Sequence, residues 1–441
     1  MPSSTDSDIA SRFNAILGNR LTRRLLVSGA IVLFGVFAYY TISRSATVTH
    51  GFTMYYVYAR VLLEEDDFSR VFDYAWFNGK VREYGIQGIQ DMPNNIPTNA
   101  LVLAPVAMFS PTGAKLTLGI ASLASLVASL LILLHVNRIS LKESLAPLIA
   151  TLFFLWRPLY ENAYLGQIYS VLLFLFCLCL LGISRSRLLL SSIPIALALL
   201  AKGYGIVPAA WLAVRHKWRQ LLILVATISL IVALTIPWLG IQSWEIFSSQ
   251  VLSTLGTLPT DAHVAFQTIN GFLFHLFTYD PVWLPFPIFV APKELLRFGS
   301  YVLNLALVLF VLNIARRHRG KFDVLSFAAA LAAGVVTAPL AEEYHFVLFL
   351  PLVIGVTVLI MRRIQNGNRP GWLDGVCLAS IIVLGVPLGY KNLQFAQFPL
   401  ILLAYPKLWS GIALLCCLSP LLDRSRKEEA EPGLKASTPA T

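Results

Sequence analysis

The chain has 441 residues, of which 57% are hydrophobic and only 13% are charged, and its formal net charge is +11. Soluble globular proteins carry charge on about a quarter of their residues, so this composition excludes an ordinary soluble domain. Backbone amides in lipid must find their partners within the same segment, and the chain is therefore predicted to be an all-α, polytopic membrane protein.

The basic residues gather in short clusters between apolar segments. If the amino terminus is cytoplasmic, most Lys and Arg residues fall on the inner side, in Arg12–Arg24, Arg215–Arg219, Arg316–Lys321, Arg362–Arg369 and the tail after Leu422. This asymmetry orients membrane proteins during insertion. It predicts cytoplasmic N- and C-termini, and it explains the net charge without a nucleic-acid partner.

In chain order, residues 1–24 form a basic leader, residues 25–422 a membrane-embedded domain, and residues 423–441 a cytoplasmic tail predicted to be disordered. The first apolar segment is followed by no clear cleavage site, so it is interpreted as an uncleaved anchor. The clearest predicted crossings are 25–43, 145–158, 166–184, 219–238, 297–315, 323–338, 345–361, 373–389 and 398–421. Together with two ambiguous regions they give about twelve transmembrane helices.

The two ambiguous regions are residues 98–136 and 187–214. For the first, charge favours one crossing, because this places Arg138 with the other inner basic residues, whereas segment length favours two short crossings. The second contains Gly203 and Gly205 and is either one long helix or two short ones. The sequence leaves both pairings open.

Two long, acid-containing stretches, 44–97 and 239–296, interrupt the apolar rhythm and are predicted to share the outer face. Both have the spacing of amphipathic helices that lie along a membrane surface. The first begins with residues 52–63, and it is expected to place three tyrosines at headgroup level: Tyr55, Tyr56 and Tyr58.

Lys202 is the most informative single residue, because an ionisable group within a membrane helix is costly and is usually functional or internally paired. On a continuous helix it would lie roughly 18 Å from Arg215. We expect Lys202 to hold a lipid phosphate or pyrophosphate, with Tyr204 beside it, or else to pair with an acid such as Glu161.

Other polar residues flank the apolar segments. Arg157 is a second candidate for phosphate binding or an interfacial anchor. Gln167 and Asn270 are each either a sugar contact or a helix cap.

A general base for transfer to a hydroxyl group is expected near the outer face. The turn Pro339–His345 holds two acids and an imidazole, and Glu343 with His345 are the first candidates. Asp91, near the end of the first long stretch, is a rival base. The alternative for the turn is a solvated polar loop.

Nucleotide-binding and soluble-hydrolase motifs are missing, so a lipid-carried donor fits better than a nucleotide sugar. The five cysteines stand in apolar segments and indicate neither disulfides nor a metal site. The sequence shows no certain cofactor, and a requirement for a divalent metal stays open.

Four short motifs in order resemble the integral-membrane glycosyltransferases of family 87, of the GT-C class. They are Phe52–Arg60, Asn95–Leu101 with Ala104–Pro105, Leu165–Gln167, and Ala201–Pro208 with Arg215–Arg219. A weaker likeness continues at Glu343–Pro351, so the resemblance covers roughly residues 25–360.

The resemblance implies a polyprenyl-phosphate sugar donor, often mannose, and inverting transfer to a lipid or glycan acceptor on the outer face of the plasma membrane, as in cell-envelope synthesis. Active members place an acid immediately before the aromatic helix, where this chain has Thr49, His50 and Gly51. Either the base has moved to Glu343, His345 or Asp91, or His50 serves. The remaining alternative is a non-catalytic carrier or partner subunit for lipid-linked sugars.

Overall fold

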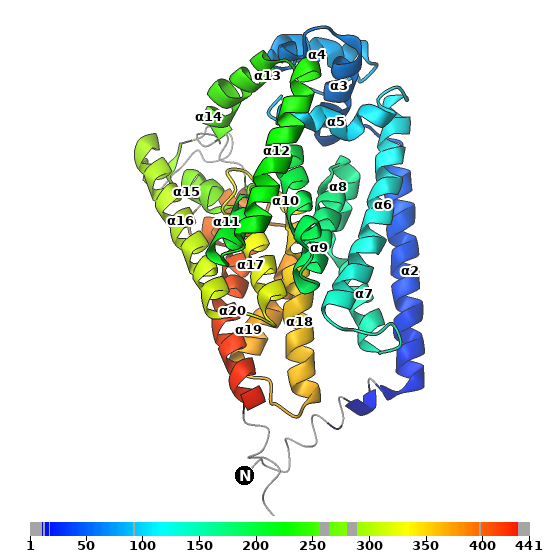
Figure 1. Cartoon of the computed structure of the whole chain (residues 1–441), viewed down its shortest axis with the longest axis vertical. Helices are drawn as coiled ribbons and strands as arrows, with labels where there is room; N and C mark the ends of the chain where they lie inside the picture. The colour runs from blue at the N-terminus through cyan, green and yellow to red at the C-terminus, as the bar shows by residue number, and fades with distance from the viewer. Residues whose placement is uncertain are drawn as a thin grey trace, which may run out of the picture.

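The computed structural model describes residues 11, 14–16, 18–90, 93–255, 264–279, 289–396 and 398–430. Within these ranges every regular element is helical, so the predicted all-α class is confirmed. The helices form an elongated bundle with α3 (His50–Glu64), α4 (Tyr74–Glu83) and α13 (Ile241–Ile246) at one end (Figure 1).

Five helical segments are long and apolar enough to cross a membrane: α2 (Arg20–Arg44), α6 (Pro111–Val136), α12 (Trp218–Leu239), α16 (Lys293–Arg317) and Glu343–Gln365, which joins η5 (Glu343–Phe349) to α18 (Leu350–Gln365). The bundle is completed by α7 (Leu145–Leu155), α8 (Arg157–Leu165), α9 (Tyr169–Ser184), α10 (Leu188–Lys202), α11 (Ile206–Val214), α17 (Asp323–Val336), α19 (Trp372–Gly385) and α20 (Pro406–Ala430). The total of about twelve crossings stays a prediction, because several of these helices are short compared with the bilayer core.

The basic turns meet at one end of the bundle, here called the basic end. Arg362 Nη2 donates to the Arg138 carbonyl at 2.8 Å, and Arg185 Nη2 lies 2.9 Å from His135 Nε2. Arg215 forms an ion pair with Asp323. Turns from distant parts of the chain therefore share this end, and its assignment to the cytoplasm stays a prediction.

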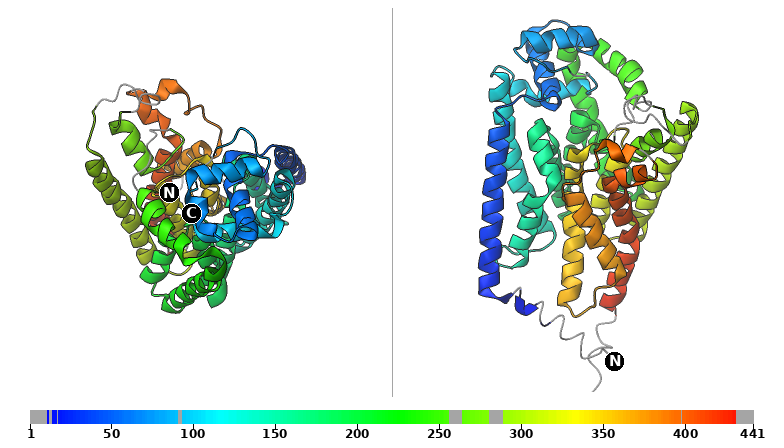
Figure 2. Two further views of the ribbon diagram at one scale, coloured as in Figure 1. Left: turned by 90° about the horizontal axis from the view of Figure 1, so that it is seen from above. Right: turned by 180° about the vertical axis from the view of Figure 1, so that it is seen from behind.

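The two long stretches lie together at the opposite end, here called the loop end. The ring of Phe72 in η1 (Phe68–Phe72) is 6.4 Å from that of Phe247 in η4 (Phe247–Val251). From behind, α3 and α4 again cover the top of the bundle, far from the basic end (Figure 2).

Helix α3 departs from the expectation for its tyrosines. Tyr55, Tyr56 and Tyr58 are buried rather than at headgroup level. Each phenol hydroxyl donates to an acceptor inside the protein, so burial leaves none of the three hydroxyls without a hydrogen bond. The acceptors are Gln167 Oε1 at 2.8 Å, the Phe109 carbonyl at 2.8 Å and the Asn95 carbonyl at 3.5 Å.

The structure shows how many helices each of the two ambiguous regions forms. Residues 98–136 contain a single long helix, α6, after short turns that end at Val106. Residues 187–214 form α10 and α11, separated by Gly203 and Gly205 at φ +72° and +136°. The 18 Å estimate for Lys202 assumed a continuous helix, and the structure interrupts that helix directly after Lys202.

Helix α20 corrects two predicted boundaries. It begins at Pro406, after the turn Leu400–Ala404, rather than at residue 398. It continues to Ala430, so residues 423–430 are helical and not part of a disordered tail. Glu428 explains the extension, because it accepts from Arg363 Nε at 2.8 Å and Arg424 Nε at 3.0 Å. Residues 431–441 lie outside the described part.

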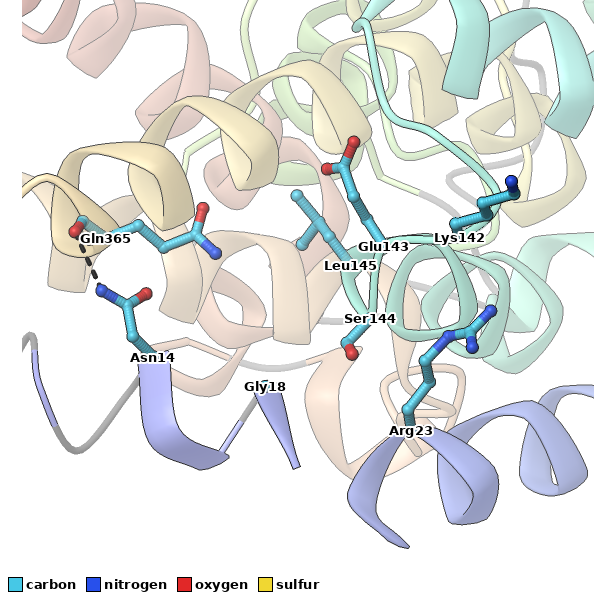
Figure 3. Close-up of a pocket in the computed structure, with 8 residues that line it drawn as sticks. All are labelled: Asn14, Gly18, Arg23, Lys142, Glu143, Ser144, Leu145 and Gln365. Atoms are coloured by element: carbon cyan, nitrogen blue, oxygen red, sulfur yellow. Dashed lines mark hydrogen bonds between the residues drawn. The ribbon is translucent and has the colours of Figure 1, made fainter. Parts of the chain in front are cut away.

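Two pockets of about 360 Å³ each lie at opposite ends. At the basic end, Asn14 Nδ2 donates to the Gln365 carbonyl at 3.2 Å on one side of the pocket, and Arg23 and Lys142 line the other side (Figure 3). At the loop end, the other pocket is lined by Ala46–Val48, Gly85–Gln87, Ile89, Pro111 and Thr112.

Candidate active site

Lys202 is the last residue of α10 and lies at the loop end. Its Nζ donates to Asn95 Oδ1 at 2.7 Å and stands 5.0 Å from the centre of the Tyr55 ring. The face of an aromatic ring carries partial negative charge and attracts a cation. An amide oxygen and a ring face therefore help to hold this half-buried ammonium.

The segment Asn95–Asn99 fastens the end of α10. Thr98 Oγ1 donates to the Leu200 carbonyl at 2.5 Å, and Asn99 Nδ2 donates to the Ala201 carbonyl at 2.6 Å. The last carbonyls of a helix lack partners within it, so these side chains satisfy groups that would otherwise be orphaned. Two motifs of the family resemblance thus meet at Lys202.

Gln167 joins two further motifs. Its Nε2 donates to the Gly51 carbonyl at 3.0 Å, and its Oε1 accepts from the Tyr55 hydroxyl at 2.8 Å. A Cβ atom on residue 51 would lie 2.4 Å from Nε2, so the approach requires glycine. Both halves of the amide are engaged by α3, and Gln167 thereby fixes the ring that faces Lys202.

His345 has a defined tautomer. The backbone N–H of Glu342 donates to His345 Nδ1 at 2.9 Å. The Glu342 carbonyl oxygen is also 3.2 Å from Nδ1, but one ring nitrogen cannot accept and donate at once. Because a backbone N–H can only donate, we assign the lone pair to Nδ1 and the proton to Nε2.

Aromatic rings surround this imidazole. The ring centre of His345 lies 4.3 Å from that of Tyr344, 4.5 Å from Tyr169 and 5.9 Å from Tyr204. Lys202 is near enough to act electrostatically on His345. The structure therefore brings four predicted residues into one connected cluster: Lys202, Gln167, Tyr204 and His345.

Glu343 faces away from this cluster. It forms an ion pair with Lys407 at 3.3 Å, and both side chains are buried. Lys407 Nζ also donates to three carbonyls at the end of α19: Val383 at 3.0 Å, Leu384 at 2.9 Å and Val386 at 2.7 Å. This geometry favours a structural role for Glu343 over the predicted proton transfer.

Two other predicted residues lie at the edge. Arg157 pairs with Glu161 at 2.5 Å, so the acid considered as a partner for Lys202 is engaged elsewhere. Asn270 Nδ2 donates to the Pro339 carbonyl at 3.2 Å. Asn270 thus supports the turn that carries His345. Asp91 lies outside the described residues.

Sequence reasoning missed several members of the site, notably Asn95, Tyr169 and Lys407. Lys407 was detectable, because it is a lone cation beside an apolar segment, like Lys202. Asn95 opens one of the four motifs, but its bond to Lys202, like the contact of Tyr169 with His345, joins segments far apart in the chain and gave no signal.

The cluster lines neither pocket. Across the ranges that the structure describes, no group of three or more His, Cys, Asp or Glu side chains is arranged to hold a metal ion.

A helical bundle with five segments long and apolar enough to cross a membrane defines the class: an integral-membrane protein. The chain belongs to glycosyltransferase family 87, a family of integral-membrane glycosyltransferases, because the family model matches residues 96–342, more than half of the chain. The match includes Gln167, Lys202 and Asn270, and it confirms the resemblance drawn from the motifs. No match was found among curated proteins or among solved structures.

Proposed function

We propose that the protein transfers a hexose or pentose, with mannose the first candidate, from a polyprenyl-phosphate donor to a lipid or glycan acceptor. The observation that carries the proposal is the Lys202 ammonium at the loop end, held by Asn95 and near enough to His345 to act on it electrostatically. Family membership supports sugar transfer, and the missing nucleotide-binding motifs support a lipid carrier.

Lys202 would act on the leaving group. When the bond from the anomeric carbon to the phosphate oxygen breaks, negative charge grows on the phosphate, and preorganised donors stabilise it. An ammonium has three protons, so Lys202 can keep its bond to Asn95 while donating to the phosphate. His345 Nε2–H would supply a neutral donor beside it.

Arg157 is proposed as a second phosphate contact, although its charge is shared with Glu161. Gln167 and Asn270 act mainly by position in this mechanism, because their amides already hold Gly51 and Pro339. Tyr204 closes the aromatic wall around His345. Holding the donor and the acceptor together supplies much of the rate enhancement in such a site.

We place the loop end on the outer face of the plasma membrane and both termini in the cytoplasm, following the distribution of Lys and Arg. Labelling of single cysteines with a membrane-impermeant reagent tests this orientation. A cysteine at exposed residue 391 should react from outside, and one at exposed residue 142 should react only after permeabilisation.

The central test is Lys202→Ala in membranes supplied with radiolabelled polyprenyl-phosphate sugars. We expect a loss of transfer of at least about 100-fold, as for removal of one transition-state donor. Lys142→Ala, an exposed lysine at the basic end, is the matched control. Near-wild-type transfer by Lys202→Ala would end the proposal. Donor binding without transfer by the wild type would instead favour the carrier function.

A further inference from the structure

The two adjacent acids in the turn before α18, Glu342 and Glu343, have different surroundings. Residues three apart on a 3₁₀-helix lie on the same side, which places Glu342 above His345 at the start of η5. The Glu342 N–H bond to His345 Nδ1 shows this alignment. Glu343 lies on another side and is held by Lys407.

Glu342 is a partly exposed carboxyl group whose Oε1 accepts from the Tyr344 hydroxyl at 3.4 Å. Charged and titratable groups from three other elements are near enough to act on it electrostatically, and none of them forms an ion pair with it among the described residues. They are His50 on α3, Glu161 on α8, and Tyr390 and Lys391 after α19. Burial raises the pKa of Glu342, with Glu161 adding to the rise, while Lys391, His50 and Tyr344 lower it.

Tyr344 connects this acid to the donor-phosphate side of the cluster. Its hydroxyl donates to Glu342, and its ring lies against His345 at 4.3 Å. The Tyr169 ring, whose centre lies 5.2 Å from that of Tyr344 and 5.6 Å from that of Tyr204, continues the contact toward the end of α10. Aromatic rings therefore connect the Glu342 side chain with the segment that carries Lys202.

Resting on the proposed glycosyl transfer, we propose that Glu342 is the catalytic base, that His345 donates a hydrogen bond, and that Glu343 is structural. Glu342 takes the proton of the acceptor hydroxyl while the oxygen of that hydroxyl forms its bond to the anomeric carbon. The bond to the phosphate oxygen breaks at the same time, and its electron pair leaves with the polyprenyl phosphate beside Lys202.

The assignment of His345 follows from its tautomer. Its other ring nitrogen, Nε2, already holds a proton, while Nδ1 is occupied by the backbone of Glu342. A base needs a free lone pair facing the acceptor. Glu342 has one, since a carboxylate offers about four lone pairs and the Tyr344 hydroxyl, at 3.4 Å, uses one of them.

The experiment compares Glu342→Gln, Glu342→Asp and Glu343→Gln in detergent-solubilised protein, with a panel of radiolabelled polyprenyl-phosphate hexoses and pentoses. We expect Glu342→Gln to lower kcat at least about 100-fold, the ordinary size of general-base catalysis, while donor binding is kept. In the wild type, kcat/KM should fall at low pH as the base becomes protonated; this fall, the acid limb of the pH profile, should disappear in Glu342→Gln and persist in Glu342→Asp. Glu343→Gln should keep the wild-type limb.

The outcomes separate the two proposals. If the wild type transfers none of these sugars, the proposed function fails and this inference falls with it. If the wild type transfers sugar and Glu342→Gln retains more than about one third of its kcat, or retains the acid limb, Glu342 is not the base. A Glu342→Asp variant as poorly folded as Glu342→Gln would assign the residue to stability instead.

Discussion

The two ends of the bundle treat buried charge differently. At the basic end, Arg363 binds Asp374 at 2.6 Å and Glu428 at 2.8 Å, and Arg424 contacts both acids. Each acid there meets two guanidinium groups. At the loop end, Glu342 meets a phenol at 3.4 Å, and the nearby cations stay beyond ion-pair distance among the described residues.

The difference indicates what each end does. Saturated ion pairs fix helix ends, and they leave little interaction energy for a ligand. A charge held by weak partners can interact more strongly with a transition state than with the resting protein, which is what catalysis requires. The surroundings of Glu342 therefore have the electrostatics expected of a reacting group, whereas the Glu343–Lys407 pair and the ion pairs of the basic end have those of a scaffold.

Arg363→Ala should give the largest loss of stability, because it leaves Asp374 and Glu428 with less positive charge in a buried place. Breaking one side of a buried pair costs about 3–5 kcal/mol. The free energy of unfolding in detergent measures this loss, and turnover per folded molecule should not change. Arg362→Ala, which removes a contact to a backbone carbonyl only, is the control. An unchanged stability would show that the basic end is not a saturated network.

Lys407→Met should destabilise the loop end by a similar amount, about 3–5 kcal/mol at most, since Glu343 is left buried without its cation. The double variant Lys407→Met/Glu343→Gln should recover part of the lost stability, because the uncompensated charge is gone. Thermal unfolding of the three proteins tests this. A double variant no more stable than Lys407→Met would argue against a structural pair.

Tyr55→Phe keeps the ring that faces Lys202 and removes the hydroxyl that donates to Gln167. Loss of a hydrogen bond that leaves a buried acceptor unpaired costs about 1–3 kcal/mol. Donor affinity should fall only slightly, whereas Tyr55→Leu should lower it further by removing the ring. Equal donor affinities of Phe and Leu variants, measured by equilibrium binding, would show that the ring does not hold the ammonium.

Lys391→Met should change the pH profile with little effect on stability. The positive charge lowers the pKa of Glu342, so its removal raises that pKa, and a higher pH is needed to form the carboxylate. The acid limb of kcat/KM should therefore move to higher pH, and Glu161→Gln should move it to lower pH. Shifts in the opposite directions would rule out Glu342 as the titrating base.

Much of the fold was predictable from sequence, because apolar length and clustered Lys and Arg directly reflect the membrane environment. Lys202 was found by the same reasoning. The partner of Glu343 was not, since Lys407 reaches it from a helix more than sixty positions later in the chain. The burial of Tyr55 depends on Gln167 in the same way. Hydropathy shows that a polar group lies near the membrane, but the contact that satisfies it depends on tertiary packing.

The side chains that fasten α10 have an electrostatic consequence. The carboxyl end of a helix carries partial negative charge and repels anions. At this end, Thr98 and Asn99 direct a hydroxyl proton and an amide proton at the carbonyls of Leu200 and Ala201. By covering these oxygens, the two residues reduce the repulsion that a phosphate would meet on its way to the adjacent lysine.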